Sequence, residues 1–168
     1  MTSPTTFVQI VFKQKILSVL LHLWQGETET ASSLSLEASK KMLALNYRAD
    51  AIYVLSLGVV AETMAKNYGA ARTILAKLVA LREDVDDIQS LGMYSYAACR
   101  LEIECGEVRF ENYVDADFRK NFARFPQYIR QGFLHLLETL APQSKLAQEL
   151  SGGRYVPSET LVPLFRLG

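Results

Sequence analysis

Apolar residues recur every three or four positions along most of this chain, which is the spacing that lets an α-helix bury one continuous face. Glycines and prolines fall where these patterns stop, as they do at helix ends. Only residues 107–113 show some strand character. The sequence therefore predicts an all-α protein, a compact bundle of about seven helices, with one domain over residues 1–150 and an extended tail over 151–168 that lies across the surface. The predicted helices cover residues 5–25, 33–46, 47–66, 70–90, 93–105, 115–125, 126–141 and 144–150.

The first predicted helix, over residues 5–25, is apolar on nearly all sides. A helix without a polar face is either buried or covered by a neighbour. Its apolar run from Ile16 to Trp24 is too short to cross a bilayer and is interrupted by Ser18 and His22, so no transmembrane segment is predicted. Neither a linker nor a repeat of about 34 residues, the period of tetratricopeptide arrays, divides the chain.

Charge and cysteine content restrict the partners and the compartment. The 168 residues include 18 basic and 18 acidic side chains, and the zero net charge argues against nucleic acid as the main partner. Hydrophobic residues make up 49% of the chain, which indicates deep burial, an apolar cavity or a surface covered by another subunit. Cys99 and Cys105 would lie on different faces of one helix, and residues 1–6 carry no basic side chain that would mark a secretion signal. We therefore expect reduced thiols and a cytoplasmic protein.

A group of acidic residues gives the clearest candidate site. On a single helix over residues 70–90, Glu83, Asp84 and Asp87 would share the side opposite the apolar stripe. Carboxylates grouped in this way repel one another unless a cation lies between them. Mg²⁺ binds carboxylate oxygens together with substrate phosphates, so the pattern indicates a magnesium site for a diphosphate. The simpler alternative is a solvated helix face.

Several segments resemble, in the same order, the carboxyl-terminal half of the trans-type isoprenyl diphosphate synthases. The sequence Glu-Asp-Val-Asp-Asp is similar to the second aspartate-rich motif of that family, with Glu83 in place of the first Asp. Arg48 stands where the family has the lysine of a Lys-Thr pair. The resemblance extends over residues 15–150. The segments that carry it are residues 23–27, 41–52, 68–69, 83–87 and 127–140.

This resemblance implies a prenyltransferase-like activity in an isoprenoid-synthase-like helical half. Glu83, Asp84 and Asp87 would bind the Mg²⁺ that holds a prenyl diphosphate, and Arg48 would contact the diphosphate. Arg100 is a basic residue near the position of the lysine that follows the second motif in the family. The family's first aspartate-rich motif has no counterpart in this chain, so the resemblance also implies a second protein chain or a homo-oligomer that completes the site.

Two other functions fit the residues. A non-catalytic helical interaction module, such as a subunit or adaptor, would use the apolar first helix to face its partner. Arg130 and His135 have the spacing found in helical ribonuclease-type toxins, although five residues correspond to about 140° around a helix. Seven aromatic residues would line an isoprenoid cavity or form part of the core. They are Tyr94, Tyr96, Phe110, Tyr113, Phe118, Phe122 and Phe125.

Overall fold

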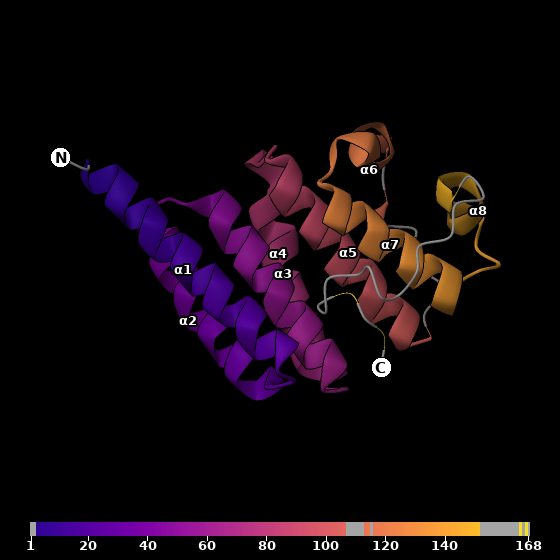
Figure 1. The fold of residues 1–168 in the computed structure, drawn as a ribbon, viewed down its shortest axis with the longest axis horizontal. Helices are drawn as coiled ribbons and strands as arrows, with labels where there is room; N and C mark the ends of the chain where they lie inside the picture. The colour runs from indigo at the N-terminus through magenta and orange to yellow at the C-terminus, as the bar shows by residue number, and fades with distance from the viewer. Residues whose placement is uncertain (1–2, 107–112, 115, 152–164, 166, 168) are drawn as a thin grey trace.

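The structure is a computed structural model that describes residues 3–106, 113, 114, 116–151, 165 and 167. Within these residues the chain forms eight α-helices and no strand, which confirms the predicted fold class (Figure 1). The predicted strand character of residues 107–113 falls almost entirely outside the described residues. The helices are α1 (Pro4–Trp24), α2 (Thr28–Ala44), α3 (Arg48–Met64), α4 (Tyr68–Leu81), α5 (Ile88–Glu104), α6 (Ala116–Asn121), α7 (Gln127–Leu140) and α8 (Lys145–Ser151).

A period of 20 residues organises the helices α2 to α5. They begin at Thr28, Arg48, Tyr68 and Ile88, so each start lies 20 residues after the one before. Three of these four helices, α2, α3 and α5, contain 17 residues each. The sequence prediction considered a repeat of about 34 residues, and it therefore missed this shorter period.

The turns between the first four helices share one backbone geometry. Gly26, Asn46 and Lys66 adopt positive φ angles of 79°, 62° and 59° two residues before the next helix begins. This left-handed residue closes a helix end in the Schellman arrangement and lets the chain enter the next helix at once. Residues 27–33, predicted as a loop, therefore lie largely in α2. The amides that close these turns are Glu27 N to His22 O, Tyr47 N to Met42 O and Asn67 N to Glu62 O, each at 2.8 Å.

The central helix is α3, which packs against α1, α2, α4 and α5. All of its residues from 51 to 61 are buried. The helices α1, α3, α5 and α7 follow one another in a row, each in contact with the next, and α2 and α4 lie behind this row in the view of Figure 1. We call the surface presented by α1, α3, α5 and α7 the odd-helix face.

The close approach of α2 to α3 depends on small side chains. At Gly58 of α3, an added Cβ would overlap with the Oγ atom of Ser35 in α2. Ser35 Oγ donates a hydrogen bond to Ser32 O at 2.8 Å, and Ser32 Oγ donates one to Glu62 Oε1 at 2.5 Å. The polar groups in this tight interface are thus paired, as buried polar groups must be.

The predicted aromatic cluster is mainly a packed core. Tyr94, Tyr96, Phe118 and Phe125 are buried, and the rings of Phe118 and Phe125 lie 5.2 Å apart between centroids. Phe110 lies outside the described residues. These side chains hold α5, α6 and α7 together through aromatic contacts of the usual tilted geometry.

One residue of the predicted surface tail is buried. Phe165 has no exposed area, and its ring packs edge-on against Tyr96 at 4.6 Å between centroids. The ring lies over Gly132 of α7, where a Cβ would overlap with it. At Phe165 the predicted tail packs against the helical domain, because a glycine in α7 leaves room for a large apolar ring.

Candidate functional site

The acidic segment does not lie on one helix, so the predicted helix over residues 70–90 is wrong. α4 ends at Leu81, and a single 3₁₀ turn, η1 (Arg82–Asp84), follows before α5 begins. Asp87 is the N-cap of α5, and its side chain accepts a hydrogen bond from Ser90 N at 2.9 Å. An Asp in this position pairs with amides that are otherwise free at a helix start, which favours a new helix over continuation of the old one.

The three predicted metal ligands do not form one group. Asp84 and Asp87 border one hollow of about 390 Å³ together with Arg48, and Glu83 is not part of it. The side chain of Asp84 is 82% exposed, and one of its oxygens is 3.7 Å from a guanidinium nitrogen of Arg48. Glu83 borders a hollow of about 310 Å³ between η1 and α6, whereas Asp87 borders a cavity on the odd-helix face. Among the described residues, no group of three or more Asp, Glu, His or Cys is placed to hold a metal ion. The magnesium site therefore stays a prediction without supporting geometry.

Arg48 lies beside the acids, as the predicted role required. It extends from the start of α3, donates a hydrogen bond to Leu81 O at 3.3 Å and pairs with Asp84. These contacts hold the end of α4 and the turn after it against α3.

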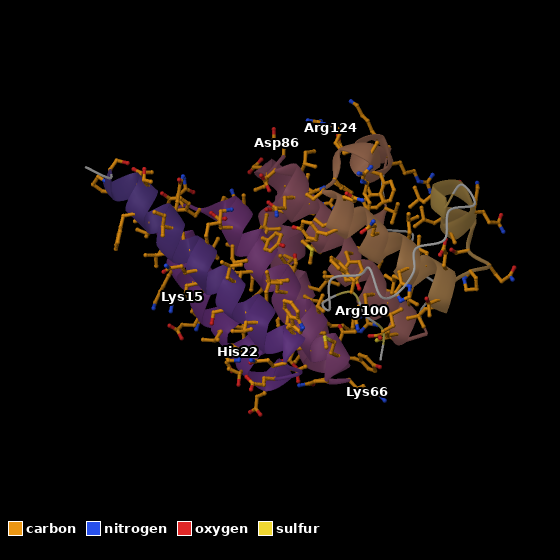
Figure 2. All side chains as sticks on the ribbon, viewed as in Figure 1. Lys15, His22, Lys66, Asp86, Arg100 and Arg124 are labelled. Carbon is orange, nitrogen blue, oxygen red and sulfur yellow. The ribbon has the colours of Figure 1, made fainter. Side chains whose placement is uncertain are left out.

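Arg100 does not join this group. It lies 13 residues after Asp87, which corresponds to about 20 Å along α5. Its side chain is 3% exposed and forms an ion pair with Glu104 at 3.6 Å. Figure 2 shows Arg100 well separated from Asp86, the neighbour of Asp87. The two predicted diphosphate contacts, Arg48 and Arg100, are therefore not brought together.

The other candidate pairs have local roles. Arg130 and His135 both lie on α7, and a helix turns their side chains about 140° apart. The His135 ring faces the hydroxyl of Thr139 at 3.5 Å. His22 pairs with Glu27 across the turn between α1 and α2. These contacts give no support to the ribonuclease-type interpretation.

Two cavities open on the odd-helix face, and α1, α3, α5 and α7 line both. The first has a volume of about 460 Å³ and lies near the N-terminal ends of α3, α5 and α7. The second has a volume of about 840 Å³ and lies near the C-terminal ends of the same three helices. Helical-repeat proteins use extended surfaces of this kind to bind partners. The odd-helix face is therefore the best candidate for a functional site.

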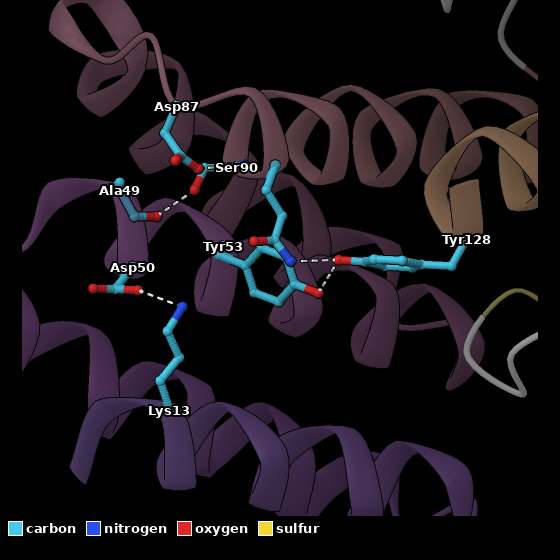
Figure 3. A network of polar contacts seen from close by, with 8 residues as sticks. Lys13, Ala49, Asp50, Tyr53, Asp87, Ser90 and Tyr128 are labelled. Carbon is cyan, nitrogen blue, oxygen red and sulfur yellow. Dashed lines mark hydrogen bonds and ion pairs between the residues drawn. The ribbon is translucent and has the colours of Figure 1, made fainter. Parts of the chain in front are cut away.

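A chain of hydrogen bonds lines the first cavity (Figure 3). Gln89 Nε2 donates to the hydroxyl of Tyr128 at 2.7 Å, and the hydroxyls of Tyr128 and Tyr53 lie 2.9 Å apart. Ser90 Oγ donates to Ala49 O at 2.8 Å. Burial raises the pKa of Tyr53, and its bond to Tyr128 raises it further, so the phenol stays protonated at neutral pH. These bonds fix α3, α5 and α7 relative to one another.

Charged groups stand at the rim of the same cavity. Burial raises the pKa of Asp50, and Asp87 also raises it, whereas Lys13 lowers it. The Lys13 ammonium is 4.0 Å from Asp50 and the lysine side chain is 68% exposed. The wall from α1 is apolar and is formed by Ile16, Leu17 and Leu20. An apolar wall with a few polar groups at its edge is the usual composition of a binding site.

Helix α1 exposes more large apolar side chains than any other element in the described residues. They are 47% to 66% exposed and follow a spacing of three and four residues that is interrupted only at Gln14. This spacing places them in one line along the helix. We call this line the α1 stripe, which consists of Phe7, Ile10, Leu17, Leu21 and Trp24. The opposite side of α1 is buried through Phe12, Ile16, Val19 and Leu23.

In the described part of the chain, α1 is also the one helix with the length and hydropathy to cross a membrane, and it lies mostly exposed. Lys13 and Lys15 occupy its middle, where each cation would cost about 2.5–3.5 kcal/mol inside a bilayer. One side of α1 already packs on α2 and α3. Both facts favour a protein surface over a membrane as the neighbour of the α1 stripe.

Comparisons with known proteins reveal no relative. No family model, no curated protein and no solved structure matches the chain. The fold and the site alone therefore define its class, an all-α bundle with a 20-residue helix period and two cavities on one face. The resemblance to isoprenyl diphosphate synthases stays a prediction.

The residues whose hydrogen bonds shape the first cavity were not singled out from the sequence, although Asp87 at its edge was. Tyr53, Gln89 and Tyr128 come from three helices, and no local pattern links them. The 20-residue period was the signal that could have found them. Because α3 and α5 are two periods apart and adjacent, residues about 40 positions apart meet, as Ala49 and Ser90 do across 41 positions.

Proposed function

We propose that this chain is a non-catalytic helical interaction module, a subunit or adaptor that binds a partner protein along α1 and the odd-helix face. The observation that carries the proposal is the α1 stripe. It contains five of the eight large hydrophobic side chains that are exposed among the described residues. Contiguous apolar patches of this kind usually mark interaction sites.

The position of α1 in the row of odd helices supports the proposal. Helix α3 packs against α1, α2, α4 and α5, and most of its apolar residues are buried. Helix α1 packs on α2 and α3, and no described residue covers its other side. In helical-repeat proteins an edge element ordinarily has a polar outer face. The outer face of α1 is apolar instead, which favours a partner that covers it.

The polar groups of the first cavity also favour binding over catalysis. Tyr53, Gln89 and Tyr128 bond to one another and hold three helices together. Ser90 Oγ is used in a bond to the backbone of α3. These groups maintain the shape of the odd-helix face, and the apolar wall of α1 remains available for a ligand side chain.

Site-specific photocrosslinking tests this function. A photoreactive amino acid replaces Leu17 in the α1 stripe or, as a control, Val79, which is 46% exposed on α4. We expect a discrete protein crosslink from position 17 in the cells that make the protein, and none from position 79. Absence of a crosslink at position 17, or the same products from both positions, would contradict the proposal.

The magnesium–diphosphate hypothesis predicts a different result. If Glu83, Asp84 and Asp87 bind Mg²⁺, then Mg²⁺ with geranyl diphosphate raises the melting temperature, and the Asp84→Ala/Asp87→Ala variant loses that rise. Because these carboxylates do not converge, we expect no rise in either protein. A magnesium-dependent rise that the double variant abolishes would make a prenyl-diphosphate-binding function the better proposal.

A further inference from the structure

We propose that the first cavity binds a small organic ammonium ion with an apolar body and a hydrogen-bond acceptor at its far end. In this arrangement the ammonium lies between Asp50 and Asp87, the body packs on the wall from α1, and the acceptor meets the bonded hydroxyls of Tyr53 and Tyr128, which we call the tyrosine pair. This assignment goes beyond the proposed function, because it gives the cavity a small-molecule ligand of its own.

The size and the wall of the cavity suit a small molecule. Its volume of about 460 Å³ lies within the range of about 300–1,000 Å³ that is typical of small-molecule sites. Ile16, Leu17 and Leu20 form an aliphatic wall on α1, and the polar lining residues come mainly from α3, α5 and α7. An apolar body that packs on this wall leaves water, which stabilises the complex.

The charge at the rim favours a cationic ligand. The charged residues that border the cavity are Lys13, Asp50 and Asp87, one positive and two negative groups with a net charge of −1. The Lys13 ammonium is 4.0 Å from Asp50, and the lysine side chain is 68% exposed whereas that of Asp50 is 24% exposed. An ion pair with one partner so exposed contributes little, so a ligand ammonium displaces Lys13 into the solvent.

Both carboxylates have capacity left for a ligand. Burial raises the pKa of Asp50, Lys13 lowers it by less, and Asp87 raises it further, so the surroundings disfavour the charged form of Asp50. An additional cation beside Asp50 offsets this effect. Asp87 uses one oxygen to accept the bond from Ser90 N at 2.9 Å, and a carboxylate has lone pairs for a further donor on the other oxygen.

A neighbouring hollow keeps the surroundings of the rim negative. It has a volume of about 390 Å³ and shares Ala49, Asp50 and Asp87 with the first cavity. The other charged residues that border it are one basic and two acidic side chains, namely Arg48, Asp84 and Asp86. An anionic head group placed at this rim would therefore meet more like charges than opposite ones.

The other end of the cavity offers a hydrogen-bond donor. In Figure 3, Asp50 and Asp87 lie at one end of the polar network and Tyr128 lies at the other. Two phenols carry two protons, and the 2.9 Å bond within the tyrosine pair uses one of them. Gln89 donates to the pair, and no other described residue accepts the second proton. Tyr53 is only 7% exposed, and a buried donor without an acceptor is costly, so a ligand oxygen at this end is favourable.

Four small compounds of one shape test these contacts separately. They are tyramine, the corresponding alcohol tyrosol, the anion of hydroxyphenylpropanoic acid, and phenethylamine, which lacks the phenol. Each is titrated into the full chain and followed by amide correlation spectra in NMR. We expect tyramine to bind saturably with a Kd on the order of 0.1–1 mM and with its largest shifts around Asp50, Tyr53 and Gln89. Tyrosol should bind about tenfold and phenethylamine about threefold more weakly, and the anion should not bind.

Charge-removing variants locate the ammonium. Asp50→Asn should weaken tyramine binding by about tenfold, and Asp87→Asn, which retains the N-cap at a more exposed position, by about threefold. Lys13→Met should tighten binding by about threefold, because it removes the competing cation. As a control, Glu29→Gln removes one charge at the start of α2, outside the cavity, and should change binding by less than about twofold. Circular dichroism confirms that each variant is folded.

Four results would overturn the proposal. Binding of tyrosol or of the anion as tight as that of tyramine, or no saturable binding of tyramine, would remove the ammonium ligand. Equal binding of phenethylamine would remove the acceptor end. Unchanged binding in both Asp50→Asn and Asp87→Asn would place the amine elsewhere, and displacement of tyramine by Mg²⁺ would assign these acids to a metal. None of these results alters the crosslink expected from position 17, which tests the proposed function separately.

Discussion

Replacement of Gly58 by alanine tests how the tight contact between α2 and α3 limits the sequence. In the middle of a helix this change ordinarily raises the free energy of unfolding by about 0.5–1 kcal/mol. Here the new Cβ would overlap with Ser35 Oγ and would lie 3.4 Å from Ser35 Cβ and 3.5 Å from Ile74 Cδ1. The packing therefore opposes the gain in helix propensity.

Either way of relieving the overlap lowers stability. If the Ser35 hydroxyl rotates away, it loses its 2.8 Å bond to Ser32 O in a fully buried position, and a buried unpaired donor costs about 1–3 kcal/mol. If α2 moves outward, the overpacking costs about 1–3 kcal/mol. After the propensity gain is subtracted, we expect Gly58→Ala to lower the free energy of unfolding by about 1 kcal/mol.

A double-mutant cycle with Ser35→Ala separates the two effects. Without the hydroxyl, the nearest atom to the new Cβ is Ser35 Cβ at 3.4 Å, which is an ordinary contact. In the Ser35→Ala background, Gly58→Ala should therefore raise the free energy of unfolding by up to about 1 kcal/mol. Urea unfolding followed by circular dichroism gives all four values, with an expected coupling of about 1–3 kcal/mol. Equal effects of Gly58→Ala in both backgrounds would refute the reasoning.

Other changes probe the C-terminal packing, the cap of α5 and the buried phenol. Phe165→Ala should lower the free energy of unfolding by about 3–5 kcal/mol, because it leaves a cavity over Gly132, and a change below about 1 kcal/mol in urea unfolding would argue against the insertion. Asp87→Ala should lower it by about 1 kcal/mol, whereas Asp87→Asn retains the cap and should have little effect; equal losses would contradict the capping role. Because burial raises the pKa of Tyr53 above its ordinary 10.0, the folded state keeps a proton that the unfolded chain loses. Stability from this group is complete below pH 10 and falls as the pH rises further, so thermal melts of Tyr53→Phe should show a smaller alkaline decrease than the wild type, and an identical decrease would exclude Tyr53 as its source.

The sequence predicted helices accurately where one pattern extended through the whole element. The predicted helix over 47–66 corresponds to α3 (Arg48–Met64), and that over 126–141 corresponds to α7 (Gln127–Leu140). Both have continuous apolar faces and recognisable ends. Local periodicity was sufficient there because tertiary contacts agree with it.

The same reasoning failed at α4 because contacts from another helix decide where α4 ends. Val85 and Ile88 continue the apolar spacing, so residues 70–90 read as one helix. In the structure, Arg48 from α3 holds Leu81 O, and Asp87 caps the next helix. The predicted metal site depended on one continuous helix over residues 70–90. Because that segment contains the end of α4, the η1 turn and the start of α5, the three acids do not share one helix face. The first cavity could not be predicted either, since its hydrogen bonds join residues 39 to 75 positions apart.

The 20-residue period also indicates which residues the fold leaves unexplained. Asp86 occupies the position that Asn46 and Lys66 hold in the earlier turns, and it is exposed as they are. Polar residues in such turns keep the chain solvated and, at Asp87, cap a helix, so the acids have a structural use without any ligand. Large apolar residues on the outer side of an edge helix have no comparable use, because exposing them to water stabilises nothing. The α1 stripe is therefore the feature for which we propose a partner, and tests of function should begin there.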